Sequence, residues 1–310
     1  MSEAAVFVLG AGSLGLLYAS KLAKAGRPVT LLVKPNQAQA LSLGVSLKAS
    51  DASLPKRVFV RLISQPYADL SIERLIIATK AGQVLSALEP WKPHLSADAQ
   101  ILMLQNGLGS QAQVADQLLP TQTLLAASVT EGAYKETSTC VVHAARGETL
   151  LGRWSGPDQQ AEKTWESRLT IAGLQARVVD AIRPVLWHKL AVNAVINPLT
   201  GLHRVANGAL ASREFQPQVQ ALCGELQQVF KRLGIPEPEG GLLGRVEQVI
   251  YATAQNFSSM YQDLQAGRQT EIDFITGSLL KAAKPLKLEL AHHQQLYEQV
   301  KQAERHSPSV

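Results

Sequence analysis

A glycine-rich turn near the start of the chain constrains its fold more than any other feature. An apolar, strand-like run at residues 4–9 leads into Gly10-Ala11-Gly12-Ser13-Leu14-Gly15. A helix-like apolar pattern follows and stops at Gly26, and a second strand-like run covers residues 29–33. Together they match a strand–turn–helix–strand unit, which occupies about 30 residues. The pattern therefore predicts the opening βαβ unit of a parallel α/β sheet.

Three glycines of this turn have distinct uses in a dinucleotide site. Gly10 permits a tight turn after the strand, Gly12 lets the backbone approach a pyrophosphate, and Gly15 lets the helix pack close to the strand. The N-terminus of the following helix offers free N–H groups and a partial positive charge to phosphates. We therefore expect the turn to bind a dinucleotide. A glycine turn with a purely structural use is the alternative.

The end of the second strand bears on which dinucleotide binds. An NAD site usually places Asp or Glu there, to accept a hydrogen bond from the ribose 2′-hydroxyl. This chain instead reads Leu31-Leu32-Val33-Lys34. A lysine attracts the 2′-phosphate that an acid would repel, so Lys34 favours NADPH over NADH. A solvated lysine at a strand end is the alternative.

Two further polar residues follow buried strands. Lys80 comes after the apolar run at residues 75–79, and Asn106 follows the run at residues 101–104. Ligands collect at the carboxyl ends of the strands in an open α/β sheet, so both residues are candidates for a site there. The alternative for Asn106 is turn formation with Gly107 alone.

The character of the chain changes near residue 180. Strands and helices alternate before it, whereas helical periods without convincing strands follow it, such as the apolar stripe that ends at Gly234. Further helices are predicted at 242 onward, 254–266, 271–286 and 290–305. The sequence thus predicts an α/β Rossmann-type N-terminal domain at residues 1–180 and a second, all-helical domain at residues 181–310.

Composition excludes several classes of partner. The net charge of +5 is spread over a chain of 310 residues without a basic run, which disfavours nucleic acid. No apolar run approaches the roughly 20 residues that span a bilayer. Cys140 and Cys223 show neither metal-ligand spacing nor a disulfide pattern, which fits a reducing compartment. We expect a cytoplasmic protein, without a metal site, that binds a small molecule.

Three polar side chains recur at helical spacing in an otherwise apolar segment. Lys189, Asn193 and Asn197 are four residues apart, so they fall on nearly the same face of a helix. The residues between them are mostly apolar, which predicts burial. A buried ammonium group and two buried amides are costly unless they are satisfied. Either the rest of the protein or a polar ligand must do so.

Polar residues also stand out later in the helical half. Asn256 begins a run that includes Ser258 and Ser259, and Glu271 precedes another apolar stretch. Helix initiation explains Asn256 equally well, and a favourable acid at a helix N-terminus explains Glu271. Asn207 followed by glycine is a good turn in its own right. Spacing alone does not choose between these explanations and a ligand site.

Taken together, these segments resemble the ketopantoate reductase (2-dehydropantoate 2-reductase) family. The match covers nearly the whole chain in family order. The glycine loop is shared by many dehydrogenases, whereas the segments Lys189–Thr200, Asn256–Asp263 and Thr270–Asp273 are specific to this family. The matching segments are Gly10–Gly15, Thr79–Ala81, Gln105–Gly109, Lys189–Thr200, Asn256–Asp263 and Thr270–Asp273.

The resemblance implies an active site in the cleft between the two domains. There, NADPH would reduce ketopantoate to pantoate, a step of pantothenate and coenzyme A biosynthesis, with Lys189 as general acid. The residues implied to bind the cofactor are Gly10, Ala11, Gly12, Ser13, Leu14, Gly15, Lys34, Lys80, Asn106, Gly132 and Glu271. Those implied to bind the substrate are Asn106, Lys189, Asn193, Asn197, Asn207, Asn256, Phe257, Ser258 and Ser259. Lys34 stands where an arginine is familiar, and apart from Gly132 the segment 130–137 is given no role.

The implied chemistry makes a prediction about Lys189. Negative charge develops on the substrate's carbonyl oxygen as hydride arrives, and the lysine would donate a proton to it. Burial should lower the pKa of this amine, while Glu271 should raise it. Two other functions fit the same scaffold: reduction of another 2-keto acid, and NADPH binding by a non-catalytic regulator. The expected oligomeric state is a monomer or a homodimer.

Overall fold

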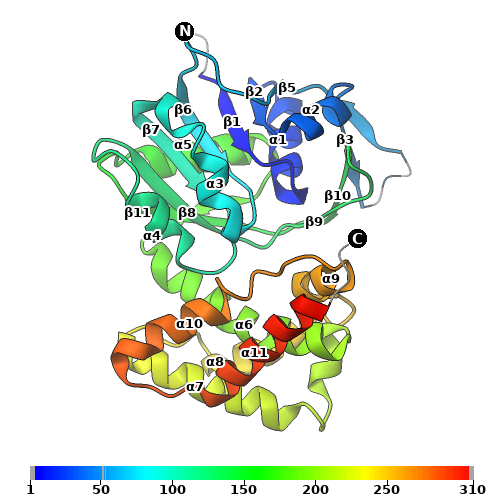
Figure 1. The fold of residues 1–310 in the computed structure, drawn as a ribbon, viewed down its shortest axis with the longest axis vertical. Helices are drawn as coiled ribbons and strands as arrows, with labels where there is room; N and C mark the ends of the chain where they lie inside the picture. The colour runs from blue at the N-terminus through cyan, green and yellow to red at the C-terminus, as the bar shows by residue number, and fades with distance from the viewer. Residues whose placement is uncertain (1–3, 51, 53, 307–310) are drawn as a thin grey trace. The chain divides into compact units, whose positions relative to one another are not determined.

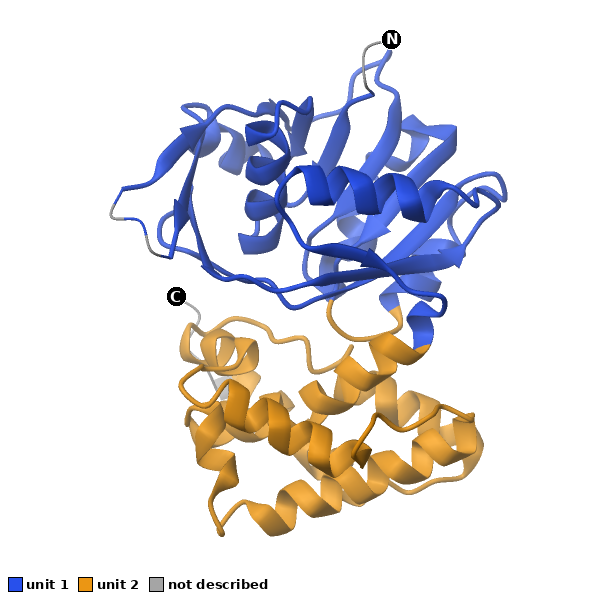
Figure 2. Ribbon diagram, turned by 180° about the vertical axis from the view of Figure 1, so that it is seen from behind, with its two compact units in different colours: residues 1–105, 110–183 blue, residues 106–109, 184–310 orange. Residues whose placement is uncertain are grey.

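The computed structural model describes residues 4–50, 52 and 54–306. The chain forms two compact units, which Figure 2 colours separately. Unit 1 comprises residues 1–105 and 110–183, and unit 2 comprises residues 106–109 and 184–310. An α/β unit is thus followed by a helical one, as the sequence predicts.

Unit 1 is built on an eight-stranded sheet (Figure 1). Its strands, in spatial order, are β12 (Ala176–Val178), β11 (Thr149–Ser155), β8 (Thr123–Val129), β7 (Leu95–Met103), β6 (Ile72–Ile77), β1 (Val6–Leu9), β2 (Val29–Leu32) and β5 (Arg61–Ile63). Neighbours are parallel except for β8 and β11. From β5 to β8 the order is that of a Rossmann sheet, and it reverses between β1 and β6. That reversal marks where a ligand of such a sheet binds.

Alternation along the strands supplies a core on each face of this sheet. In β1, Val6 and Val8 face one core, whereas Phe7 and Leu9 face the other. The first core also contains buried side chains of two helices, α1 (Ser13–Lys24) and α5 (Ala161–Ile171). The second contains side chains of α3 (Val84–Leu88) and α4 (Ser110–Ala115). The remaining helical segments of unit 1 are α2 (Pro35–Leu41), η1 (Ala81–Gln83) and η2 (Lys92–His94).

A second, four-stranded sheet lies against α1 from the side away from β1 and β2. Its order is β4 (Lys56–Val58), β3 (Val45–Ala49), β10 (Cys140–Ala145) and β9 (Gly132–Lys135). Helix α1 packs on β3, β9 and β10 as well as on β1 and β2. The sequence pattern predicts a strand at residues 140–144, which is β10, and none of the other three strands. The others are short, and β4 and β9 carry mostly polar or exposed residues.

The described residues of unit 2 form helices joined by loops, without strands. Its elements are α6 (Ile182–His203), η3 (Asn207–Ala211), α7 (Gln216–Leu233), α8 (Gly241–Ala252), α9 (Ser259–Gln265), α10 (Thr276–Ala283), η4 (Lys284–Leu286) and α11 (Ala291–His306). The first two residues of α6 belong to unit 1, and the rest of the helix belongs to unit 2. In the described part of the chain, no helix combines the length and apolarity that a membrane crossing requires.

Two of the helices expected in unit 2 begin later than the sequence pattern suggests. Residues 253–258 are turn and loop, because the hydroxyl of Ser258 accepts a hydrogen bond from Tyr261 N and thereby starts α9. Residues 271–275 form a turn before α10. Asn256 is therefore not a helix cap, and Glu271 is not in the first turn of a helix. Both simpler explanations of these residues are wrong.

Candidate active site

Two of the three loop glycines are required by the fold. Gly10 has φ +105°, and a Cβ there would lie 2.8 Å from Thr79 Cγ2. A Cβ on Gly15 would lie 2.0 Å from the carbonyl oxygen of Gly10, so only glycine lets α1 start this close to the loop. At Gly12, in contrast, the nearest atom to a Cβ would be Ala78 O at an ordinary 3.6 Å. Packing does not explain glycine there, whereas close approach by an external group does.

The start of α1 is suited to an anion. Gly12 is the N-cap residue and has no side chain to cap the helix, and the first turn contains no acid. The first N–H groups of the helix therefore point their partial positive charge outward. A phosphate at this position would satisfy them, as in dinucleotide sites built on a strand–loop–helix turn.

Lysines stand at the ends of strands beside this loop. Exposed Lys34 directly precedes α2, just after β2, and half-buried Lys80 follows β6. Both thus lie at the carboxyl edge of the sheet, as predicted. Gly132, at the start of β9, is tightly packed, since a Cβ there would lie 2.9 Å from the Cβ of Ala145. Its glycine is explained by that packing, and its contact with a cofactor stays a prediction.

Lys135 is a residue that the sequence analysis missed. Its Nζ lies 3.5 Å from the carbonyl oxygen of Ala11, in the glycine loop. Strand pairing aligns Lys135 with Val141 and Ala133 with His143, so these residues share the face of the sheet that packs on α1. The alternation of residues in β9 places Lys135 on this face, but a strand of four residues is too short to be recognised from the sequence.

In unit 2, the predicted stripe does lie on one long helix. Lys189, Asn193 and Asn197 all belong to α6, and the apolar residues between them are buried. Lys189 and Asn193 are half-buried, and Asn197 is buried. Burial lowers the pKa of the Lys189 amine to about 8, and the nearby Glu271 carboxylate opposes that lowering. Both directions agree with the sequence-based expectation.

A loop from the middle of the chain reaches Glu271. The amide Nδ2 of Asn106 donates to Glu271 Oε2 at 3.4 Å. Leu108 fixes this loop, because its N–H donates to Phe274 O at 2.9 Å and its carbonyl accepts from Ser278 Oγ at 2.7 Å. The structure thus brings Asn106, Glu271 and Lys189 together within unit 2, although they are far apart in sequence.

The remaining predicted substrate residues lie in or beside a second loop, residues 253–258. Asn207 N donates to Asn256 O at 2.9 Å, and Asn207 Nδ2 donates to Thr253 Oγ1 at 2.8 Å. Thr200, on α6, lies with its hydroxyl 2.8 Å from Ser258 Oγ. These contacts tie the loop to the end of the helix that carries the stripe.

Around this second loop, some side chains are already hydrogen-bonded within the protein, whereas others are exposed or keep an unsatisfied polar atom. Buried Ser258 is occupied as a helix cap and by Thr200. Asn256, Phe257 and Ser259 are exposed. In the part of the chain that the structure describes, buried Asn207 Oδ1 has no hydrogen-bond partner within the protein. An orphaned buried acceptor of this kind fits a site that receives a polar ligand.

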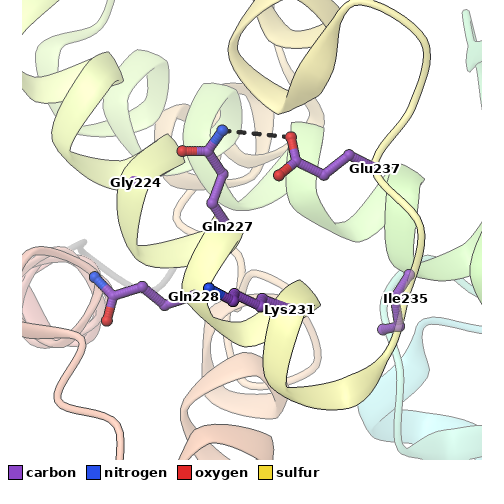
Figure 3. A pocket seen from close by; sticks show the side chains of 6 residues that line it. All are labelled: Gly224, Gln227, Gln228, Lys231, Ile235 and Glu237. Carbon is purple, nitrogen blue, oxygen red and sulfur yellow. Dashed lines mark hydrogen bonds between the residues drawn. The ribbon is translucent and has the colours of Figure 1, made fainter.

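Other hollows of unit 2 lie away from these residues. Figure 3 shows an open pocket beside α7, in which Gln227 Nε2 donates to Glu237 Oε2 at 3.3 Å. A second pocket lies between α6, α7 and α11 and is lined by Leu199, Leu222 and Leu296 among others. Neither pocket contains Lys189 or either stripe asparagine. Across residues 4–50, 52 and 54–306, no group of His, Cys, Asp and Glu is arranged to hold a metal ion.

The sheet order and the glycine loop define a Rossmann fold, and the family match makes the protein an oxidoreductase. The chain belongs to the ketopantoate reductase PanE/ApbA family. The N-terminal model of that family matches residues 6–156, and its C-terminal model matches residues 181–304. The protein is therefore a reductase of the ApbA family.

Individual relatives resemble the chain along nearly its whole length. The 2-dehydropantoate 2-reductase of Vibrio cholerae serotype O1 is 35% identical over 97% of this chain and 98% of its own. The crystal structure of a PanE/ApbA family ketopantoate reductase from Ralstonia eutropha JMP134 covers 97% of this chain and 99% of its own, with a TM-score of 0.88 and 25% identity. D-mandelate dehydrogenase, solved with NADH and anilino(oxo)acetate, covers 97% and 98%, with a TM-score of 0.90 and 21% identity. The last likeness concerns the fold alone.

Proposed function

We propose that this protein reduces 2-dehydropantoate to pantoate with NADPH, and that Lys189 is the general acid. One observation carries the proposal: a half-buried lysine with a lowered pKa stands beside a carboxylate and on the same helix as two carboxamides. A proton donor needs a pKa near the working pH, and burial supplies it here. Full-length relatives named 2-dehydropantoate 2-reductase support the choice of substrate.

The residues of unit 1 fit a nicotinamide dinucleotide. The uncapped start of α1 and the open space at Gly12 suit a pyrophosphate, and Lys34 suits a 2′-phosphate. Further polar residues proposed to hold the cofactor are Lys80 of unit 1 and Asn106 and Glu271 of unit 2. When bound, the cofactor supplies the hydride for the carbonyl carbon.

The chain's own residues supply the proton and the orientation. As the carbonyl oxygen gains negative charge, the Lys189 ammonium donates a proton to it and stabilises the charge before transfer is complete. Asn193 and Asn197 orient the substrate's polar groups without adding charge. The hydroxyl of Ser259 is free to donate toward the substrate carboxylate, since it lies exposed at the start of α9.

A second candidate is the reduction of a different 2-keto acid. D-mandelate dehydrogenase shares this fold and was solved with NADH and a keto-acid analogue, so the scaffold accommodates other substrates and the other nicotinamide dinucleotide. A non-catalytic NADPH-binding regulator is disfavoured, because a binder has no use for a lysine of lowered pKa beside a carboxylate.

A substrate panel tests the proposal directly. The purified protein is assayed for NADPH oxidation with ketopantoate and with other 2-keto acids, and again with NADH. The proposal requires the highest kcat/KM for ketopantoate with NADPH, and a faster reaction with another keto acid selects the second candidate. Lys189→Ala should abolish turnover but retain NADPH binding, whereas Lys231→Ala, a change on an exposed face of α7, should leave both intact.

A further inference from the structure

Helix α11 holds the turn that carries Glu271 through hydrogen bonds to Thr270, the residue that precedes Glu271. Thr270 N and Thr270 Oγ1 both donate to Glu304 Oε1, at 2.8 and 2.7 Å. The same hydroxyl accepts from Ile272 N at 3.1 Å. One carboxylate oxygen of Glu304 therefore fixes the residue just before Glu271.

The other side of the turn is held by the same helix. Asp273 Oδ1 accepts from the hydroxyl of Tyr297 at 2.6 Å, and Asp273 Oδ2 accepts from Lys301 Nζ at 3.0 Å. Lys301 Nζ also lies 3.0 Å from Glu304 Oε2. Lys301 thus joins the two anchors, and Glu271 lies between them.

This network is shielded from solvent more than a surface ion pair is. The side chain of Glu304 is 10% exposed and that of Lys301 is 26% exposed. A carboxylate this buried is costly unless it is fully hydrogen-bonded, and Glu304 is satisfied by the turn and by Lys301. Paired, charge-assisted contacts of this kind fix geometry as well as contributing energy.

Charged and polar groups from several elements surround the turn. Helix α11 contributes Tyr297, Lys301 and Glu304, and the turn contributes Asp273 and Glu271. The Glu271 carboxylate of this turn interacts electrostatically with the Lys189 amine of α6, and it accepts a hydrogen bond from the neutral Asn106 amide. On the neighbouring α9, Asp263 is paired with Arg268 at 2.9 Å.

We infer that Lys301 and Glu304 are positioning residues for the proton donor: they hold the turn at residues 270–273 so that the Glu271 carboxylate stays beside the Lys189 amine. The inference rests on the proposed role of Lys189 as general acid. Neither α11 residue is assigned to substrate or cofactor, so their effect on catalysis passes through Glu271. Loss of Lys301 or Glu304 loosens the turn, so the Glu271 carboxylate stabilises the protonated Lys189 amine less.

The test compares Lys301→Met and Glu304→Ala with Glu298→Ala. Glu298 lies exposed on the same helix, and its Oε1 accepts from Gln294 Nε2 at 2.6 Å, away from the turn. In the two anchor variants, the alkaline limb of the kcat profile for reduction should move to lower pH by about half a unit or more. The Glu271 carboxylate stabilises the protonated Lys189 amine, and these variants no longer hold it in place. The KM for NADPH should change less than kcat does. The control should match the wild type.

A second readout is independent of the substrate. Reductive ¹³C-methylation followed by NMR titration measures the pKa of Lys189 directly, with its signal assigned by its loss in Lys189→Arg. A lower pKa in both anchor variants is the expected result, and an unchanged pKa in folded variants overturns the inference. Tyr297→Phe, which removes one hydrogen bond while keeping the ring, decides the matter if either variant fails to fold. Wild-type inactivity on ketopantoate would contradict the proposed function without affecting this titration.

Discussion

Glu225 offers a sharp test of what holds the helical unit together. It lies on α7 and is 7% exposed, yet its carboxylate accepts four hydrogen bonds from the start of α11. Oε1 accepts from the backbone N and ring Nδ1 of His292, and Oε2 accepts from the same two atoms of His293, at 2.7–3.1 Å. A side chain of one helix therefore caps the N-terminus of another.

The strength of this cap follows from the pKa of the carboxyl group. Burial raises the pKa of Glu225, but the hydrogen bonds from His293 and His292 outweigh it and bring the pKa to about 2, from a usual 4.5. A shift of this size corresponds to about 3 kcal/mol of folding free energy. Because the folded pKa lies below the unfolded one, the stabilisation is fully present above about pH 4.5 and is lost as the pH falls toward 2.

Glu225→Gln removes the charge and leaves one acceptor oxygen for four donors. We expect the free energy of unfolding to fall by about 3 kcal/mol at neutral pH, and the difference from the wild type to shrink to about half by roughly pH 3. Urea unfolding followed by circular dichroism and by tryptophan fluorescence measures both values; among the four tryptophans, Trp187 reports on α7, because its ring centroid lies 6.1 Å from that of Phe230. Glu298→Gln, at an exposed position of α11, is the control. A loss below about 1 kcal/mol, or a difference that does not change with pH, would refute the reasoning.

Four further outcomes are expected. The kcat for reduction should be flat below pH 8 and fall about tenfold per unit above it, since Lys189 must be protonated and its pKa is about 8; a flat profile to pH 10 contradicts this. Lys34→Glu should raise the Kd for NADPH at least tenfold while changing that for NADH little, as calorimetry can show. Lys135→Met should weaken NADPH binding severalfold with little change in Tm, because Nζ lies beside Ala11 O; a lower Tm with unchanged affinity indicates a structural role. Gly15→Ala should prevent folding or lower Tm strongly, because its Cβ would lie 2.0 Å from the Gly10 carbonyl oxygen.

Local spacing was sufficient to predict the parts of the fold with a clear period. The glycine loop stands between β1 and α1 as predicted, and the stripe of Lys189 and the two asparagines lies on α6. Both signals lie within about 30 residues or fewer, over which periodicity is informative. Helix α9 starts later than the sequence pattern predicts because Ser258, rather than Asn256, caps its N-terminus.

The rest of the site depends on contacts between distant residues. Asn106 and Glu271 are 165 residues apart, and Thr270 and Glu304 are 34 apart, so no spacing rule connects them. The strand that carries Lys135 has only four residues, none of them fully buried, and is too short for a reliable alternation. A resemblance to a known family supplied Glu271 as a candidate, but its anchoring by α11 could be learned only from the structure.

The loop at residues 106–109 has a consequence for how proteins of this kind can be recombined. It belongs to unit 2, although β7 before it and α4 after it belong to unit 1. Gly107 has φ +80°, and a Cβ there would lie 2.2 Å from Phe274 O, so the loop is fitted closely to its own helical unit. A chimaera joined only at residue 183 would combine this loop from one parent with the Phe274 turn of another. Exchange of the helical units between relatives should therefore succeed only when residues 106–109 travel with them.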